Sequence, residues 1–263
     1  MLPKIRFTEL IIRPQKVWIK ILVLTNIISF AFLLIISLHY QVPQKVINKL
    51  SLKKLDKSEK LEYITRYCTY IDYRQMAIHS LVNGNAGFEI VMLGDSITAI
   101  GNWNVLLNRT DVANFGIGGD ATSYLLYRLF DVYLAKPKKC FLMIGINDFA
   151  GNDTVENVFN NYISIIEDIR RHNIEIIIQS TLYLSETASG FSHIGNNWKN
   201  INVQVNNLNE LLIKYCHVNG LTYLDLNEIL SKDNVLEEEN TTDGVHLNET
   251  GYKKWRDKLM MYL

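Results

Sequence analysis

Short apolar runs alternate with longer amphipathic stretches through the last two thirds of the chain. Five runs have the length and the composition of strands: 88–94, 112–116, 140–145, 174–180 and 221–226. Four stretches repeat their apolar positions at a helical period: 121–134, 154–172, 197–219 and 248–262. Strands that alternate with helices predict an α/β fold, in which a parallel sheet carries helices on both faces.

The first 86 residues do not follow this alternation. Ile21–Leu38 contains no charged residue, and Trp18 and Tyr40 flank it. A helix from Trp18 to Tyr40 would be roughly 33 Å long, close to the thickness of the hydrocarbon core of a membrane. A cleavable signal peptide and a buried core helix are the alternatives. The length of the run, and the lack of small residues after it, favour an uncleaved anchor.

The chain therefore divides into four predicted parts. These are a basic tail at 1–17, a transmembrane helix at 18–40, a helical stalk at 41–86 and a compact domain at 87–263. Basic residues lie on both sides of the predicted span, at 4–20 and at 45–54. The short basic tail before the span favours a cytoplasmic N-terminus, so we expect the compact domain on the extracytoplasmic side.

Charge and cysteine content narrow the function classes. Lys and Arg together number 27, as do Asp and Glu, so no overall positive charge indicates a nucleic-acid partner. The chain has three scattered cysteines, Cys68, Cys140 and Cys216, and an odd number does not fit a disulfide framework. Because the His, Cys and acidic residues lack ligand spacing, we expect no metal and no cofactor.

Four polar segments carry the candidate chemistry. They are Gly-Asp-Ser-Ile-Thr at 94–98, Asn-Phe-Gly-Ile-Gly-Gly-Asp at 114–120, Gly-Ile-Asn-Asp at 145–148 and Asp-Gly-Val-His at 243–246. The first three follow predicted strands, and the fourth precedes the last predicted helix. Because active sites of parallel sheets lie at the carboxyl ends of the strands, we expect these segments to meet there.

Together the segments contain the groups that a serine nucleophile requires. Ser96 is the candidate nucleophile, His246 the base that removes its proton, and Asp243 the carboxylate that orients the imidazole. Backbone N–H groups of Gly119 and Ser96 and the side-chain amide of Asn147 are candidate donors to an oxyanion.

Each segment also has a simpler interpretation. The glycines could form a plain turn or a phosphate cradle, although Gly-x-Gly-Gly lacks the spacing of a nucleotide motif. Asn147 and Asp148 could cap a helix, and Asp243 and His246 could be a surface pair. The shared placement at strand ends favours the catalytic interpretation.

These four segments, in this order, resemble the SGNH (GDSL-type) hydrolase family over about residues 88–263. Residues 114–120, followed by Leu-Tyr-Arg-Leu at 126–129, are similar to the catalytic subunits of platelet-activating factor acetylhydrolase. The resemblance implies a flavodoxin-like three-layer α/β/α sandwich and ester hydrolysis without a cofactor. It also implies a triad of Ser96, Asp243 and His246, with an oxyanion hole completed by Gly119 and Asn147.

The resulting expectation is a membrane-anchored serine esterase or deacylase. Its substrate would be a small O-acyl ester, preferably acetyl, of a carbohydrate or a lipid. An acyltransferase that uses a sugar hydroxyl as acceptor, and an inactive scaffold, are the alternatives. From position alone, Trp103 and the segment 183–199, with Trp198, are candidates to line the pocket, whereas His172, His193 and His217 are expected to be surface or structural residues.

Overall fold

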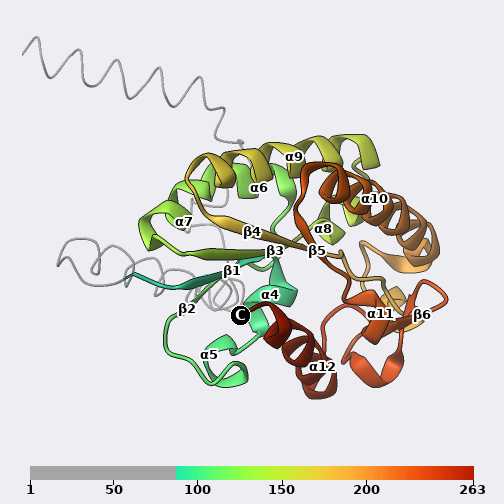
Figure 1. The fold of residues 1–263 in the computed structure, drawn as a ribbon. Coiled ribbons are helices and arrows are strands. Elements are labelled where there is room, and N and C mark those ends of the chain that lie inside the picture. Colours follow the sequence, from blue (N-terminus) through green and yellow to red (C-terminus); the bar gives the residue numbers. More distant parts are fainter. Residues whose placement is uncertain (1–86) are drawn as a thin grey trace, which may run out of the picture. The chain divides into compact units, whose positions relative to one another are not determined.

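The computed structural model describes residues 87–263, which form an α/β domain (Figure 1). Five strands form its main sheet: β1 (Ile90–Gly94), β2 (Val112–Gly116), β3 (Lys139–Met143), β4 (Glu175–Gln179) and β5 (Thr222–Leu224). All neighbouring pairs are parallel, and their spatial order is β2-β1-β3-β4-β5. The predicted parallel sheet is confirmed.

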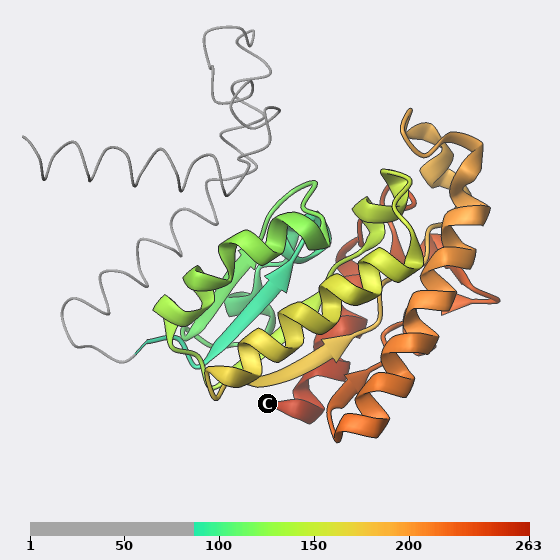
Figure 2. The same cartoon turned by 90° about the horizontal axis from the view of Figure 1, so that it is seen from above.

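Helices cover both faces of this sheet. The longer ones are α7 (Leu129–Ala135), α9 (Val155–Arg171), α10 (Trp198–Asn219) and α12 (Glu249–Leu259). The short ones are α4 (Ser96–Ile100), α5 (Trp103–Leu106), α6 (Thr122–Leu125), α8 (Ile146–Ala150) and α11 (Asn227–Leu230). Figure 1 shows α7, α9 and α10 over one face of the sheet, with α5 and α12 over the other; seen from above, the C-terminal helix α12 lies behind the sheet (Figure 2). A two-stranded hairpin, β6 (Ser231–Lys232) with β7 (Val235–Leu236), follows α11.

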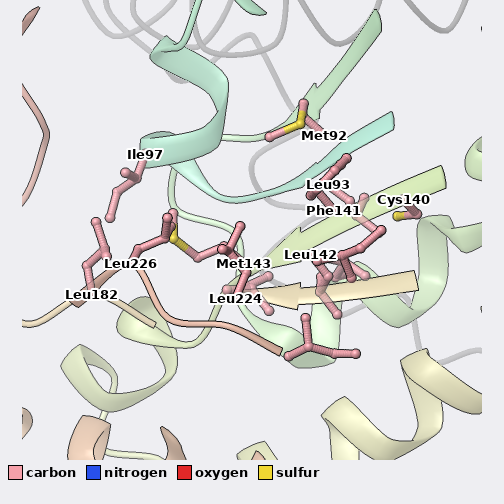
Figure 3. Close-up of a cluster of buried hydrophobic side chains, with 14 of the residues drawn as sticks. Met92, Leu93, Ile97, Cys140, Phe141, Leu142, Met143, Leu182, Leu224 and Leu226 are labelled. Carbon is pink, nitrogen blue, oxygen red and sulfur yellow. The ribbon is translucent and has the colours of Figure 1, made fainter. Parts of the chain in front are cut away.

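The interior of the sheet explains the near-continuous apolar runs. Every residue of β1 and β2 is buried, because helices pack on both faces. Leu93, Phe141 and Leu142 lie side by side in the centre, joined by Leu224 of β5 (Figure 3). Each such side chain contributes about 1.5–3 kcal/mol by leaving water.

The sequence pattern located the long elements better than the short ones. The predicted strand at 112–116 has the observed bounds, and the other four strands are shorter than predicted at one or both ends. The stretch predicted as a helix near 121–134 is helical over residues 122–135, but a 3₁₀ turn, Leu126–Arg128, divides it into α6 and α7. The helices α4, α5, α8 and α11 were not predicted, because four or five residues are too few to show a helical period.

The predicted basic tail, transmembrane helix and stalk at 1–17, 18–40 and 41–86 lie outside the described residues. Within residues 87–263, none of the helices has both the length and the apolar character needed to cross a bilayer.

Candidate active site

The turn after β1 places Ser96 at the first position of α4. Asp95 caps this helix, and its Oδ1 accepts a hydrogen bond from the Ile97 N–H at 2.9 Å. At Gly94 a Cβ atom would lie 2.2 Å from the Met143 carbonyl oxygen, so the end of β1 can pass β3 this closely only as glycine. The result is a tight strand-to-helix turn that presents the serine hydroxyl at the sheet edge.

Burial changes the chemistry of the capping carboxyl. Asp95 is 1% exposed, and its burial raises its pKa to about 7. The hydrogen bond from the Ile97 N–H lowers the pKa, but by less than burial raises it. The nearby carboxyls of Asp120 and Asp148 raise it further. Asp95 therefore serves the turn as a cap that takes up a proton near neutral pH.

A continuous chain of hydrogen bonds joins Ser96, His246 and Asp243. The Ser96 Oγ lies 2.9 Å from the His246 Nε2, and the His246 Nδ1 lies 2.7 Å from the Asp243 Oδ2. Both distances are those of ordinary hydrogen bonds. This is the relation between nucleophile, base and orienting carboxylate that activates a serine.

Asp243 is held by its own loop. Its second oxygen, Oδ1, accepts hydrogen bonds from the backbone N–H groups of His246 at 2.7 Å and Val245 at 3.0 Å. Partial burial raises the pKa of Asp243, but hydrogen bonds from the His246 side chain and from these N–H groups outweigh it, so the pKa lies below its usual value. The carboxyl is therefore ionised at neutral pH.

The segment 185–188 packs against the loop 243–246. Gly244 has a φ of +87°, and a Cβ there would lie 2.1 Å from the Ala188 backbone nitrogen. The Ser185 N–H donates to the Gly244 carbonyl at 3.0 Å. The loop therefore requires glycine for both its conformation and its packing.

The candidate oxyanion donors lie in the same cleft as Ser96 and His246. Gly119, with a φ of +75°, follows β2, and Asn147 lies in the first turn of α8 after β3. One N–H of the Asn147 Nδ2 donates to the Asp120 carbonyl at 2.9 Å, which fixes the amide plane and leaves the second N–H to serve the cleft.

The adjacent Asp148 does not cap the following long helix. Its carboxylate accepts hydrogen bonds from the Thr122 backbone N–H and hydroxyl, and so joins α8 to α6. The long helix α9 is capped instead by Thr154, whose side chain accepts from the Asn157 N–H.

The cleft has a volume of about 790 Å³. Apart from the residues above, its walls are mainly apolar: Ala99, Ile100, Gly118, Ile146, Ala150, Phe191, His193, Ile194 and Val245. Three of these, Phe191, His193 and Ile194, come from the segment between β4 and α10. The prediction that the segment 183–199 lines the pocket is therefore confirmed for these three residues.

Three predictions about individual residues are wrong. Trp103 is 1% exposed; its Nε1 donates to the Thr98 carbonyl and its ring packs on Trp255, so it belongs to the core. Trp198 lines a separate cleft of about 300 Å³ beside the β6–β7 hairpin. His193, expected to be a surface or structural residue, lines the candidate active site. Only its position in the inserted segment 183–199 pointed to the cleft.

Known proteins share the sequence pattern of this site. The profile of the GDSL-like lipase/acylhydrolase family matches residues 92–254, which include all four polar segments. The chain belongs to this family. Its described domain is accordingly a GDSL-type serine hydrolase domain, of the class that hydrolyses ester bonds.

Curated relatives cover parts of the chain. An N-acylneuraminate cytidylyltransferase from Streptococcus agalactiae is 26% identical over 161 residues, which are 60% of this chain and 35% of that protein. The platelet-activating factor acetylhydrolase IB subunit alpha2 of Rattus norvegicus is 27% identical over 175 residues, 63% of this chain and 72% of that one. The chain thus spans about a third of the length of its streptococcal relative.

Solved structures of GDSL-type proteins share the fold. A GDSL-like lipase from Bacteroides thetaiotaomicron aligns with a TM-score of 0.62 at 20% identity, covering 73% of this chain and 97% of that one. A lipase/acylhydrolase from Enterococcus faecalis aligns with a TM-score of 0.54 at 21% identity, covering 66% and 94%.

Proposed function

We propose that this protein is a serine esterase in which Ser96, His246 and Asp243 form the catalytic triad. The observation that carries the proposal is the continuous chain of contacts, 2.9 Å from Ser96 to His246 and 2.7 Å from His246 to Asp243, with Ser96 and His246 lining a cleft. In this arrangement Asp243 accepts the Nδ1–H, and the Nε2 is left free to accept the serine proton.

The reaction proceeds in two steps. The Ser96 Oγ bonds to the acyl carbon while His246 takes the hydroxyl proton, and the oxyanion accepts hydrogen bonds from the N–H groups of Ser96 and Gly119 and from Asn147. His246 then returns the proton to the departing alcohol, which leaves an acyl-enzyme. In the second step a water loses a proton to His246 and attacks the acyl carbon. The bond between the acyl carbon and the Ser96 Oγ then breaks, His246 returns the proton to Oγ, and the carboxylic acid leaves.

For the substrate we propose a small O-acyl ester, preferably acetyl, whose alcohol is a carbohydrate or a lipid. The names of two relatives support a carbohydrate alcohol and an acetyl group: one names N-acylneuraminate, a sugar acid, and the other an acetylhydrolase. The cleft, at about 790 Å³, is much larger than an acetyl group and has room for the alcohol as well.

We further propose that residues 18–40 anchor the protein in a membrane, with the catalytic domain on the extracytoplasmic side. The uncharged run Ile21–Leu38 and its flanking aromatics support this proposal. Protease treatment of intact cells that produce the chain with a C-terminal tag tests it. Loss of the tag without lysis is expected, and a protected tag would reverse the orientation.

The esterase proposal is tested with the full-length chain in detergent. We expect hydrolysis of p-nitrophenyl acetate that Ser96→Ala abolishes, while Ser164→Ala, an exposed serine on α9, retains full activity. A panel of O-acetylated N-acetylneuraminate, acetylated xylo-oligosaccharides and short-chain lipid esters then identifies the alcohol. Equal activity of Ser96→Ala and the parent would refute the triad. Acetyl transfer to an added sugar in excess of hydrolysis would make the protein a transferase.

A further inference from the structure

The Leu-Tyr-Arg-Leu motif at 126–129 supplies no residue of the proposed triad, yet the side chain of its arginine, Arg128, is largely buried. The Arg128 side chain is 11% exposed, and it enters the domain from the 3₁₀ turn that separates α6 from α7. A buried guanidinium is costly unless its donors are satisfied, so its partners are informative.

One guanidinium binds the ends of two strands and the glycine loop. The Arg128 Nη2 donates to the Gly94 carbonyl at 2.9 Å, and Nη1 donates to the Phe115 carbonyl at 2.7 Å. Nε donates to the Asp120 Oδ2 at 2.7 Å, and Nη2 lies 2.6 Å from the same oxygen. The planar fork of arginine satisfies these acceptors at once, whereas the point charge of lysine does not.

Two of these three acceptors lie close in the sequence to a candidate oxyanion donor. Gly94 is two residues before Ser96, and Asp120 directly follows Gly119. The backbone carbonyl of Asp120 accepts the hydrogen bond that orients the Asn147 amide, at 2.9 Å. The three donors come from three separate strand ends, and Arg128 connects two of these ends directly and the third through Asp120.

We propose that Arg128 is a positioning residue that assembles the oxyanion hole, acting on Asn147 and Gly119 through Asp120. The inference rests on the proposed esterase function. The hydrogen bonds of Arg128 described above go to Gly94, Phe115 and Asp120 and not to Ser96 or His246, and Arg128 is not among the residues that line the cleft. Its removal therefore leaves the nucleophile and the base in place and displaces the donors that stabilise the transition state.

The kinetic signature of this role is a loss in kcat rather than in KM. Because oxyanion donors act mainly in the transition state, Arg128→Gln is expected to lower kcat by about 10- to 100-fold with KM changed by less than about threefold. A phenylboronic acid, which forms a tetrahedral adduct with the serine, should lose affinity by a similar factor as kcat/KM.

A matched control is available just before the amino end of β2. Arg109 forms an ion pair with Asp111 at the amino end of β2, the edge of the sheet opposite to the site, with Nε donating at 2.7 Å. Arg109→Gln removes an arginine–aspartate pair of the same type and is expected to leave kcat within about twofold of the parent. A comparable loss in both variants would mean that Arg128 acts only through stability.

Arg128→Lys covers the case in which Arg128→Gln does not fold. Lysine retains a positive charge for Asp120, so the variant is expected to fold, but it cannot bind both strand-end carbonyls. We expect a loss in kcat of about tenfold, with unchanged circular dichroism at the assay temperature. Full activity of Arg128→Lys would overturn the proposal that the fork geometry matters.

A double-mutant cycle with Asn147→Ala decides whether Arg128 acts through the donors. If it does, Arg128→Lys should reduce kcat by less than about threefold once Asn147 is already alanine. Multiplicative losses would refute the route through Asn147. Ser96→Ala distinguishes failure of the esterase proposal from failure of the Arg128 proposal. If Ser96→Ala retains hydrolysis, the esterase proposal fails. If Ser96→Ala abolishes hydrolysis but the losses in the double-mutant cycle multiply, only the role of Arg128 is refuted.

Discussion

At the scale of single residues, the loop 243–246 does two tasks with one carboxylate. The Asp243 Oδ1 closes the loop on the backbone, and its Oδ2 orients the imidazole at 2.7 Å. An amide in this position could still accept the backbone hydrogen bonds, but it would carry no charge to stabilise the imidazolium. Loop geometry and catalysis can therefore be separated by one substitution.

We expect Asp243→Asn to lower kcat by about 10³- to 10⁴-fold while the protein stays folded. Hydrolysis of p-nitrophenyl acetate and thermal unfolding measure the two effects. Asp225→Asn is the control, because the Asp225 Oδ1 also accepts a backbone N–H two residues later, from Asn227. Activity of Asp243→Asn close to that of Asp225→Asn would contradict the assigned role.

The buried cap at Asp95 predicts a pH dependence of stability. Its pKa of about 7 in the folded protein lies above its usual value of 3.8, so between these values the folded protein holds a proton that the unfolded chain has released. The free energy of unfolding therefore falls as the pH rises from about 4 to about 7. Above pH 7 this loss is complete.

Asp95→Asn keeps a capping oxygen and does not titrate. Relative to the parent, we expect this variant to gain stability between pH 5 and pH 8, by on the order of 2 kcal/mol. Urea unfolding at the two pH values measures the difference. A difference between variant and parent that does not change with pH would show that Asp95 is already charged in the folded state.

At the scale of elements, the strand ends were predictable, whereas the walls of the cleft were predictable only in part. Ser96, Gly119 and Asn147 were found because each follows an apolar run, and the topology of a parallel sheet brings such positions to one edge. The positions of Trp103 and His193 depend instead on how short helices and an inserted segment pack against the sheet. No periodicity within four or five residues carries that information, so these assignments failed.

The inserted segment predicts where alcohol specificity lies. His193 lines the cleft and is edge-on to Phe191, whose ring in turn faces His246 at 6.3 Å between centroids. We expect His193→Ala to raise KM for the best ester of the substrate panel by about 5- to 10-fold, through loss of one hydrogen bond to the alcohol. p-Nitrophenyl acetate should be hydrolysed as before. His217→Ala, on the far end of α10, is the control, and equal effects on both esters would exclude a role in specificity.

At the scale of the whole domain, the order β2-β1-β3-β4-β5 determines where a site can form. The chain leaves β1 toward β2 and then returns past β1 to β3, so the connections diverge at the carboxyl end of β1, beside Ser96. The buried sheet holds this edge in place. Its rigidity comes from packing between β1 and β3, where Leu93 and Leu142 are fully buried neighbours.

Removal of a central side chain should therefore affect stability much more than chemistry. We expect Phe141→Ala, a fully buried change in β3, to reduce the free energy of unfolding by about 3–5 kcal/mol. Phe130→Ala is the control: Phe130 is 64% exposed on α7, and its loss should change stability by less than about 0.5 kcal/mol. Urea unfolding compares the two, and similar values would place Phe141 outside the cooperative core.

The hydrogen bond between His246 and Ser96 joins residues 150 positions apart in the chain. The base comes from a loop that follows the last strand of the main sheet, and the adjoining helix α12 is fastened back to α4 through the Tyr252 hydroxyl, which donates to the Ile97 carbonyl at 2.6 Å. A nascent chain that ends before residue 246 thus carries the proposed nucleophile without its proposed base. If the proposed triad is correct, ester hydrolysis can begin only after the ribosome has passed residue 246, so activity during synthesis would report that His246 has reached Ser96.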